Sequence, residues 1–373
     1  MATVRTREDY EHVLAALGAA ISCRIPALLW GDPGSGKTSV VESATLLGWH
    51  VETLIISHYE PSDLAGLPLL SGDRVLLAPP AWAVRLREIP GPSIAFFDEF
   101  STASPALQAA ALRPLTHYQV GELQLPETVS FVAAANPADV AAAGWELAAP
   151  TASRFVHLDW GLPLDVYAEC LVSGAWPSLP VGPIPEGYEA ELDRQRALVA
   201  GFLRARATQL SAIPKDAAGR GRAFPTPRTW DYAARLAAYA IASGSAAEVV
   251  ALLVAGCVGE MVAHEFLTFA RAADLPDPED VLAGAFDFTG LRPDRTYVVL
   301  QAVLAAVQRR PTAPRWTAAV AACARAAEVG IDPAVPVVRA LLRPGARPAG
   351  AELPPGITVF APVLALAGLL PGA

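Results

Sequence analysis

The sequence predicts an α/β fold, in which a mostly parallel sheet is flanked by helices and is followed by all-helical segments. Up to about residue 160, short apolar runs alternate with helical patterns, as expected when helical crossovers join parallel strands. The runs that indicate strands are 25–30, 51–56, 93–97, 129–135 and 155–158. After Trp160 the pattern changes to stretches rich in alanine and leucine, broken by proline and glycine. We therefore expect an α/β domain over 1–162, a helical domain over 163–271 and a helical extension over 272–373.

The composition is that of a globular protein. The chain has 373 residues, 53% of them hydrophobic, and a net charge of −9. This negative balance weighs against a surface that coats nucleic acid, because phosphate backbones attract clustered lysine and arginine. The N-terminus lacks the apolar segment of a signal peptide, and the longest apolar run, 357–370, is too short to span a bilayer. We expect a cytoplasmic protein without membrane contact.

Four cysteines are spread far apart along the chain. They show neither a C-x-x-C pair nor histidines at metal-binding spacing, so the sequence indicates no disulfide framework and no zinc site. We expect reduced thiols in the core. Of the six histidines, only His58 lies beside the expected site, and we keep it as a candidate.

A helix over 6–20 is expected before the first strand, and a complete match to G-x-x-x-x-G-K-S/T follows that strand at 31–38. Its glycines let backbone N–H groups curl around a phosphate chain, while a lysine ammonium reaches the β- and γ-phosphates. Lys37 is one of only two lysines in the chain, and a helix over 38–47 completes the strand–loop–helix setting. The residues expected to bind the nucleotide are Gly31, Asp32, Pro33, Gly34, Ser35, Gly36, Lys37, Thr38 and Ser39.

Two further strands end in polar residues. The strand 93–97 leads into Asp98 and Glu99, of which the first can anchor Mg²⁺ and the second can polarise an attacking water. The strand 129–135 leads into Asn136, which can hydrogen-bond the γ-phosphate or the water, or can serve only as a turn residue before proline.

Arg154 and Arg228 each stand at the start of a predicted element, a strand and a helix respectively. The planar, permanently charged guanidinium suits a phosphoryl group in transfer, because it stabilises charge spread over several oxygens. The alternative for either residue is an ordinary solvated surface charge.

The remaining elements are mainly helical. Helices are expected at 163–173, 188–211, 229–242, 246–271, 296–309, 314–328 and 335–342. The segment 116–130 indicates two short strands around Gly121, either an ordinary surface hairpin or a functional one. The segment 272–373 fits a docking platform and a stabilising extension equally well.

The order and spacing of these motifs resemble an AAA+ ATPase, and within that superfamily the MoxR branch and its dynein-related relatives. Three stretches carry the finer resemblance, namely 60–66, 105–112 and 134–137, and the similarity covers roughly residues 5–265. The resemblance implies that Lys37 and Thr38 bind the phosphates and Mg²⁺ of ATP. It also implies that Asp98 holds the Mg²⁺ sphere and that Glu99 activates water.

The same resemblance assigns the remaining polar residues. Asn136 would be the sensor 1 residue, Arg228 a sensor 2 residue acting in cis from the helical lid, and Arg154 a finger inserted into a neighbouring subunit's site. A finger of this kind implies a ring-shaped homo-oligomer, for which a hexamer is the family's usual state. Ser153 departs from the family pattern, because relatives often carry an acidic residue immediately before the finger.

The resemblance implies ATP-driven remodelling of a protein client, often together with a partner that bears a von Willebrand factor A domain. In the family, the hairpin within 116–130 can face the pore or the client. One alternative is a motor acting on nucleic acid, which needs a basic pore-facing segment that 116–130 lacks. The other alternative is a nucleotide-gated scaffold with negligible turnover. The intact Glu99 and Asn136 disfavour it, whereas Ser153, in place of an acidic residue before Arg154, favours it.

Overall fold

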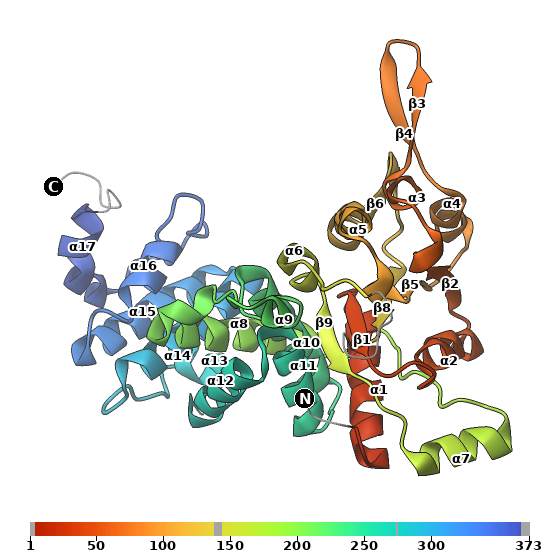
Figure 1. The fold of residues 1–373 in the computed structure, drawn as a ribbon. Helices are drawn as coiled ribbons and strands as arrows, with labels where there is room; N and C mark the ends of the chain where they lie inside the picture. The colour runs from red at the N-terminus through yellow and green to blue at the C-terminus, as the bar shows by residue number, and fades with distance from the viewer. Residues whose placement is uncertain (1–3, 138–143, 274, 367–373) are drawn as a thin grey trace. The chain divides into compact units, whose positions relative to one another are not determined.

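The computed structural model describes residues 4–137, 144–273 and 275–366, and the chain divides into two compact units (Figure 1). Unit 1 contains Met1–Tyr188 and Gln209–His264, whereas unit 2 contains Glu189–Thr208 and Glu265–Ala373. These units differ from the three segments expected from the sequence. Helices α10 and α11, which fall in the expected lid 163–271, share unit 1 with the sheet, and the role of that segment as a lid stays a prediction.

Unit 1 is built on a parallel five-stranded sheet, which confirms the predicted fold class. Its strand order is β2-β5-β8-β1-β9. The strands are β1 (Ala27–Trp30), β2 (His50–Ile55), β5 (Ser93–Asp98), β8 (Val129–Ala135) and β9 (Val156–Asp159). All four pairings are parallel, with Trp30 opposite Ala135 and Ile55 opposite Asp98. The carboxyl ends of the strands therefore meet at one edge of the sheet.

Helices surround this sheet (Figure 1). The helices of unit 1 are α1 (Arg7–Ser22), α2 (Lys37–Glu42), α3 (Pro61–Ala65), α4 (Ala81–Glu88), α5 (Pro105–His117), α6 (Ala149–Ala152), α7 (Leu164–Ser173), α9 (Ala217–Arg220), α10 (Pro227–Ala242) and α11 (Ala247–Val258). Short 3₁₀ turns occur at Ser43–Leu47, Ile56–His58, Phe100–Thr102 and Ala207–Leu210. The expected helix over 38–47 is therefore α-helical only to Glu42. Helix α1 begins at a capping box, in which Thr6 and Asp9 each accept a backbone hydrogen bond from the other.

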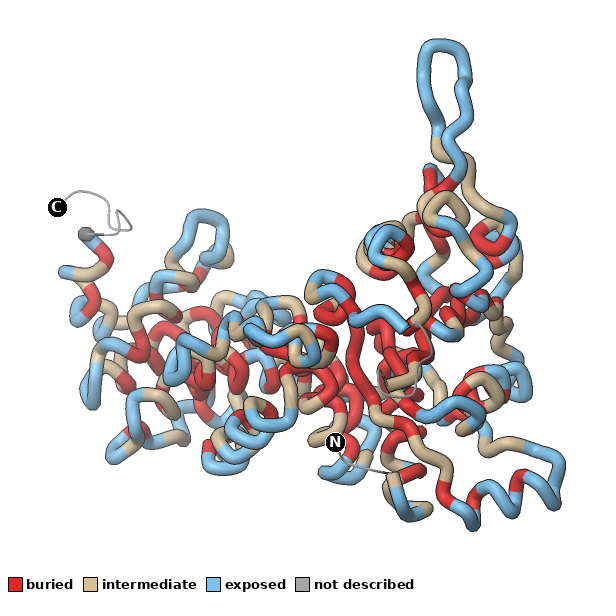
Figure 2. Tube along the Cα trace, in the orientation of Figure 1, coloured by how far each residue is buried: buried red, intermediate tan, exposed pale blue. Residues whose placement is uncertain are grey.

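Aromatic side chains form the core beside the sheet. Phe97 lies with its ring centroid 5.5 Å from that of Phe131 and 6.3 Å from that of Trp82. Such pairs contribute about 0.5–1.5 kcal/mol each beyond the area they bury. Trp82 and Trp160 are buried, and all four cysteines are buried free thiols, as the sequence predicts. Buried residues are concentrated in the strands of the main sheet (Figure 2).

Two β-hairpins lie outside the main sheet. The expected hairpin around Gly121 is present as β6 (Gln119–Val120) and β7 (Leu123–Gln124). A longer hairpin, β3 (Leu67–Ser71) and β4 (Arg74–Ala78), was not expected from the sequence. The sequence carries a signal for this hairpin, because the two residues Gly72-Asp73 separate two apolar runs. In the structure Gly72 has a φ of +63°, which suits such a turn.

Unit 2 is helical, as predicted for the C-terminal region. Its helices are α8 (Tyr188–Ala205), α12 (Glu260–Ala273), α13 (Pro278–Leu282), α14 (Pro293–Arg309), α15 (Ala313–Val329), α16 (Val335–Leu341) and α17 (Ala361–Leu366), with a 3₁₀ turn at Pro355–Phe360; α8 and α12 begin in unit 1. The prediction of a single helix over 246–271 is wrong. The chain leaves α11 at Gly259, whose φ of +85° interrupts an α-helix, and then starts α12.

Candidate nucleotide-binding site

The phosphate-loop motif connects β1 to α2 at the carboxyl edge of the sheet. Gly34 and Gly36 have φ values of +74° and +80°, in the left-handed region that glycine adopts without strain. These turns bring the loop back over the end of β1, and the side chain of Ser35 donates a 2.7 Å hydrogen bond to the Asp32 carbonyl. The local sequence therefore folds into a tight loop that leads directly into a helix.

Lys37 is almost fully buried beneath this loop, with 8% of its surface exposed. Its ammonium donates to the carbonyls of Gly31 and Asp32 at 2.7 and 2.8 Å and to Asn136 Oδ1 at 3.0 Å. Burial lowers the pKa of Lys37, while the charges of Asp98 and Asp32 act in the opposite direction. The structure thus brings Lys37 and Asn136, 99 residues apart, into direct contact.

The two carboxylates that follow β5 lie at the same edge of the sheet. Asp98 accepts a 2.7 Å hydrogen bond from Thr38 Oγ1 through Oδ2, and its Oδ1 accepts the backbone N–H of Glu99 at 2.9 Å. Glu99 has a φ of +56°, which is unusual for a residue other than glycine and costs about 1–2 kcal/mol. This turn separates the two carboxylates, so that Asp98 contacts the phosphate-loop helix and Glu99 does not share that contact.

Sequence reasoning missed two serines in this cluster. Ser57 follows β2 and donates a 2.9 Å hydrogen bond to Glu99 Oε2, and Ser101 Oγ accepts the backbone N–H of Asn136 at 3.1 Å. The signal for Ser57 was its position after a strand that borders β5 in the sheet. His58, the one histidine kept as a candidate, is exposed in the adjoining 3₁₀ turn, and no hydrogen bond to it is seen among the described residues.

The two candidate arginines lie together at the opposite edge of the sheet. Val156 pairs with Ala27 at the amino end of β1, and Arg154 stands two residues before it. Arg154 Nε donates to Thr116 Oγ1 at 2.5 Å, and Arg228 Nη1 lies 3.4 Å from Ser153 Oγ. Burial, followed by the charge of Arg228, lowers the pKa of Arg154. The expected action of Arg228 on its own phosphate loop does not follow from this geometry, because that loop adjoins the other end of β1.

Comparison with known families decides the identity of this region. A profile of the AAA domain (dynein-related subfamily) matches residues 26–155, from just before β1 to just before β9. Residues 26–155 are an AAA domain of the dynein-related subfamily. A search of curated proteins gave no match.

Two solved structures are similar to this chain at low sequence identity. A protein from Cytophaga hutchinsonii, described provisionally as an ATPase, matches at 16% identity with a TM-score of 0.43, over 69% of this chain and 88% of its own. A full-length MCM homolog from Methanopyrus kandleri matches at 16% identity with a TM-score of 0.34, over 69% of this chain and 53% of its own. At this level of similarity, neither structure bears on the activity of this chain.

A second polar cluster adjoins the phosphate loop of the AAA domain on the side of β9. Trp30 Nε1 donates a 2.9 Å hydrogen bond to His157 Nδ1, and the Arg222 guanidinium lies 4.3 Å from the Trp30 ring centroid. Arg222 also pairs with Asp159 at 3.1 Å. Tertiary packing therefore ties the loop at 222 to the ends of β1 and β9, and no sequence motif indicated this arrangement.

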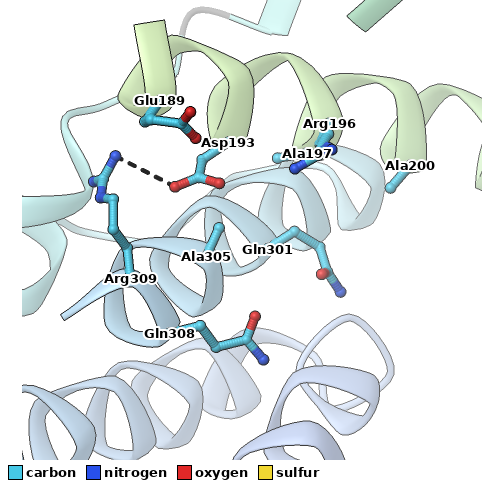
Figure 3. A pocket seen from close by; sticks show the side chains of 9 residues that line it. All are labelled: Glu189, Asp193, Arg196, Ala197, Ala200, Gln301, Ala305, Gln308 and Arg309. Carbon is cyan, nitrogen blue, oxygen red and sulfur yellow. Dashed lines mark ion pairs between the residues drawn. The ribbon is translucent and has the colours of Figure 1, made fainter. Parts of the chain in front are cut away.

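A separate pocket of about 450 Å³ lies within unit 2 and contains none of the predicted site residues (Figure 3). It is lined by Glu189, Asp193, Arg196, Ala197, Ala200, Gln301, Ala305, Gln308 and Arg309. Asp193 pairs with Arg309 at 3.3 Å, and burial raises the pKa of Asp193.

Among the described helices of the chain, none is long and apolar enough to cross a membrane.

Proposed function

We propose that this chain is an ATP-hydrolysing AAA+ motor of MoxR type, which remodels or activates a protein client. The observation that carries the proposal is the group of side chains at the carboxyl edge of the sheet, where Thr38 meets Asp98 and Lys37 meets Asn136. The AAA domain implies ATP binding, and these contacts supply the polar groups that a triphosphate requires. Cytoplasmic location belongs to the same proposal.

ATP binding rests on the phosphate loop, residues 31–39. All three N–H donors of the Lys37 ammonium now contact oxygens of its own chain. Phosphate oxygens would replace some of these acceptors, and the negative phosphates would offset the burial that disfavours a charged lysine. The hydroxyl of Thr38 and the carboxylate of Asp98 fit Mg²⁺, which prefers oxygen ligands and would neutralise phosphate charge there.

Hydrolysis requires a base that faces water, and Glu99 is exposed at the end of β5. Glu99 would accept a proton from the attacking water, while Asn136 would orient the water or the γ-phosphate. Ser57 holds Glu99 through a hydrogen bond to a carboxylate oxygen. Glu99 must leave Ser57, or share this bond, before both oxygens can serve the water.

We assign Arg154 and Arg228 together to the site of a neighbouring subunit. Both residues lie at the edge of the sheet remote from the phosphate loop. Burial is the larger cause of the lowered pKa of Arg154, and repulsion by the charge of Arg228 adds to it. An anion between them would relieve this repulsion, and phosphoryl oxygens of a neighbour's nucleotide are such an anion. This arrangement supports a ring-shaped homo-oligomer, for which we favour a hexamer.

The proposed client is a protein, and the proposed partner bears a von Willebrand factor A domain. The hairpin β3–β4 supports a protein contact, because it exposes large apolar side chains, with Leu70 80% and Val75 64% exposed. The net charge of −9 makes nucleic acid an unfavourable partner. Residues 272–373 could dock the partner or extend the helical unit, and both roles stay predictions.

ATP turnover measured against protein concentration, with sedimentation in parallel, tests the proposal. Wild type should assemble with nucleotide, and its specific activity should rise with assembly. Glu99→Gln should bind ATP without hydrolysing it, and Arg154→Ala and Arg228→Ala should each lower turnover without weakening binding. The matched control is Arg113→Ala, which removes an exposed arginine from α5.

Three outcomes would count against this mechanism. Turnover that survives the loss of Arg154 and Arg228 would exclude them from a neighbour's site. Turnover that does not depend on assembly would remove the case for a ring. Nucleotide-dependent assembly without turnover would favour the scaffold, in which Ser57 permanently occupies a carboxylate oxygen of Glu99.

A further inference from the structure

A strap over residues 174–187, between α7 and α8, passes beside the phosphate loop. Gly182 N donates to Ser22 Oγ of α1 at 3.1 Å, and Ser43 Oγ, just after α2, donates to the Pro177 carbonyl at 3.1 Å. Leu179 between them is fully buried. The strap is thus anchored to the helix before β1 and to the helix that follows the phosphate loop, and its four prolines restrict its backbone further.

Trp176, near the start of this strap, rests against the phosphate loop itself. A Cβ placed on Gly36 would lie only 2.3 Å from Trp176 Cη2 and 2.6 Å from Cζ3. The six-membered ring of the indole therefore packs onto the glycine that precedes Lys37. The Trp176 side chain is only half-buried, so part of its aromatic surface remains accessible.

A second tryptophan also contacts the phosphate loop. Trp160 Nε1 donates a 2.9 Å hydrogen bond to the Ser35 carbonyl, and Trp160 is 5% exposed. Trp160 is buried and contacts the loop from within the fold, whereas part of the Trp176 ring at the same loop remains accessible to solvent. The two residues therefore differ in what they offer to a bound molecule.

We propose that Trp176 contacts the base of the nucleotide whose phosphates lie in the 31–39 loop. This inference rests on the proposed function and names the recognition element of the same site. The base is joined to the phosphates through ribose, so it lies beside the loop, where an accessible aromatic ring on an anchored strap can stack on it. Stacking of a base on an aromatic side chain changes affinity by about tenfold or more.

The test compares ADP with inorganic tripolyphosphate, which has phosphates but no base, by isothermal titration of the full-length chain. Trp176→Ala should weaken ADP binding about tenfold and leave tripolyphosphate binding unchanged. Trp176→Phe should retain most of the ADP affinity, because it keeps an aromatic ring. The matched control, Trp49→Ala, removes another half-buried tryptophan and should affect neither ligand.

A second readout uses fluorescence. ADP should change the tryptophan emission of wild type more than that of Trp176→Phe, and tripolyphosphate should not reproduce this difference. Equal weakening of ADP and tripolyphosphate in Trp176→Ala would refute base contact and show that Trp176 only shapes the phosphate loop. Unchanged ADP affinity in Trp176→Ala would also refute it. Failure of wild type to bind either ligand would instead refute the proposed function.

Discussion

Acidification should destabilise unit 1 through one buried imidazole, that of His157 in β9. Its Nδ1 accepts the indole N–H of Trp30, so its single proton lies on Nε2, which donates to the Ala152 carbonyl at 2.9 Å. A second proton would place two N–H groups against each other at Trp30. Burial is the main cause that lowers the pKa of His157 to about 4, and Arg222 adds to the effect.

The magnitude follows from the difference between this pKa and the ordinary value of 6.5. Because the folded pKa is the lower one, the unfolded chain binds the proton more readily, and stability is lost as pH falls below 6.5. About 2 kcal/mol should be lost between pH 8 and pH 5, and about 3 kcal/mol once the pH is below 4. The stability contributed by neutral His157 is fully present above 6.5, the pKa of this histidine in the unfolded chain.

Urea unfolding at several values between pH 8 and pH 5 measures this effect. Seven of the eight tryptophans lie in unit 1, so fluorescence reports mainly on its transition. His157→Gln should lower stability at pH 8 but show a shallower loss on acidification than wild type, while His117→Gln, which changes an exposed histidine, should retain the wild-type slope. An equal loss of stability on acidification in wild type and in His157→Gln would refute the claim that a buried neutral His157 causes the loss.

Three further outcomes follow from the contacts described above. Ser57→Ala should raise basal ATP turnover by up to about tenfold by releasing Glu99, and unchanged turnover would show that the bond does not restrain it. In urea unfolding, Gly256→Ala should lower the unfolding free energy by about 1–3 kcal/mol, because its Cβ would lie 2.4 Å from the His157 carbonyl oxygen. The control is Gly182→Ala, whose Cβ would have no atom within 4 Å. Replacing Leu70 and Val75 by serine should leave the melting temperature of the unassembled chain unchanged in calorimetry, and a clear decrease would show that β3–β4 is packed in that state.

Much of the fold could be predicted from local patterns. Each apolar run assigned to a strand of the α/β domain is a strand, because buried parallel strands are short, continuous and apolar. The errors arose where one or two residues override the pattern. Gly259 splits an apparently continuous helix, and Gly72-Asp73 turns an apolar stretch into the hairpin β3–β4.

The sequence by itself determined the phosphate loop, the carboxylates after β5 and the asparagine after β8, because each is a contiguous motif at the end of a strand. Only the tertiary structure decided which residues meet. The strand order brings Lys37 to Asn136, the strap brings Trp176 to Gly36, and packing before β9 joins Arg228 to Ser153. These contacts join residues about 75 to 140 positions apart, so they depend on strand order and helix packing, which local periodicity does not encode.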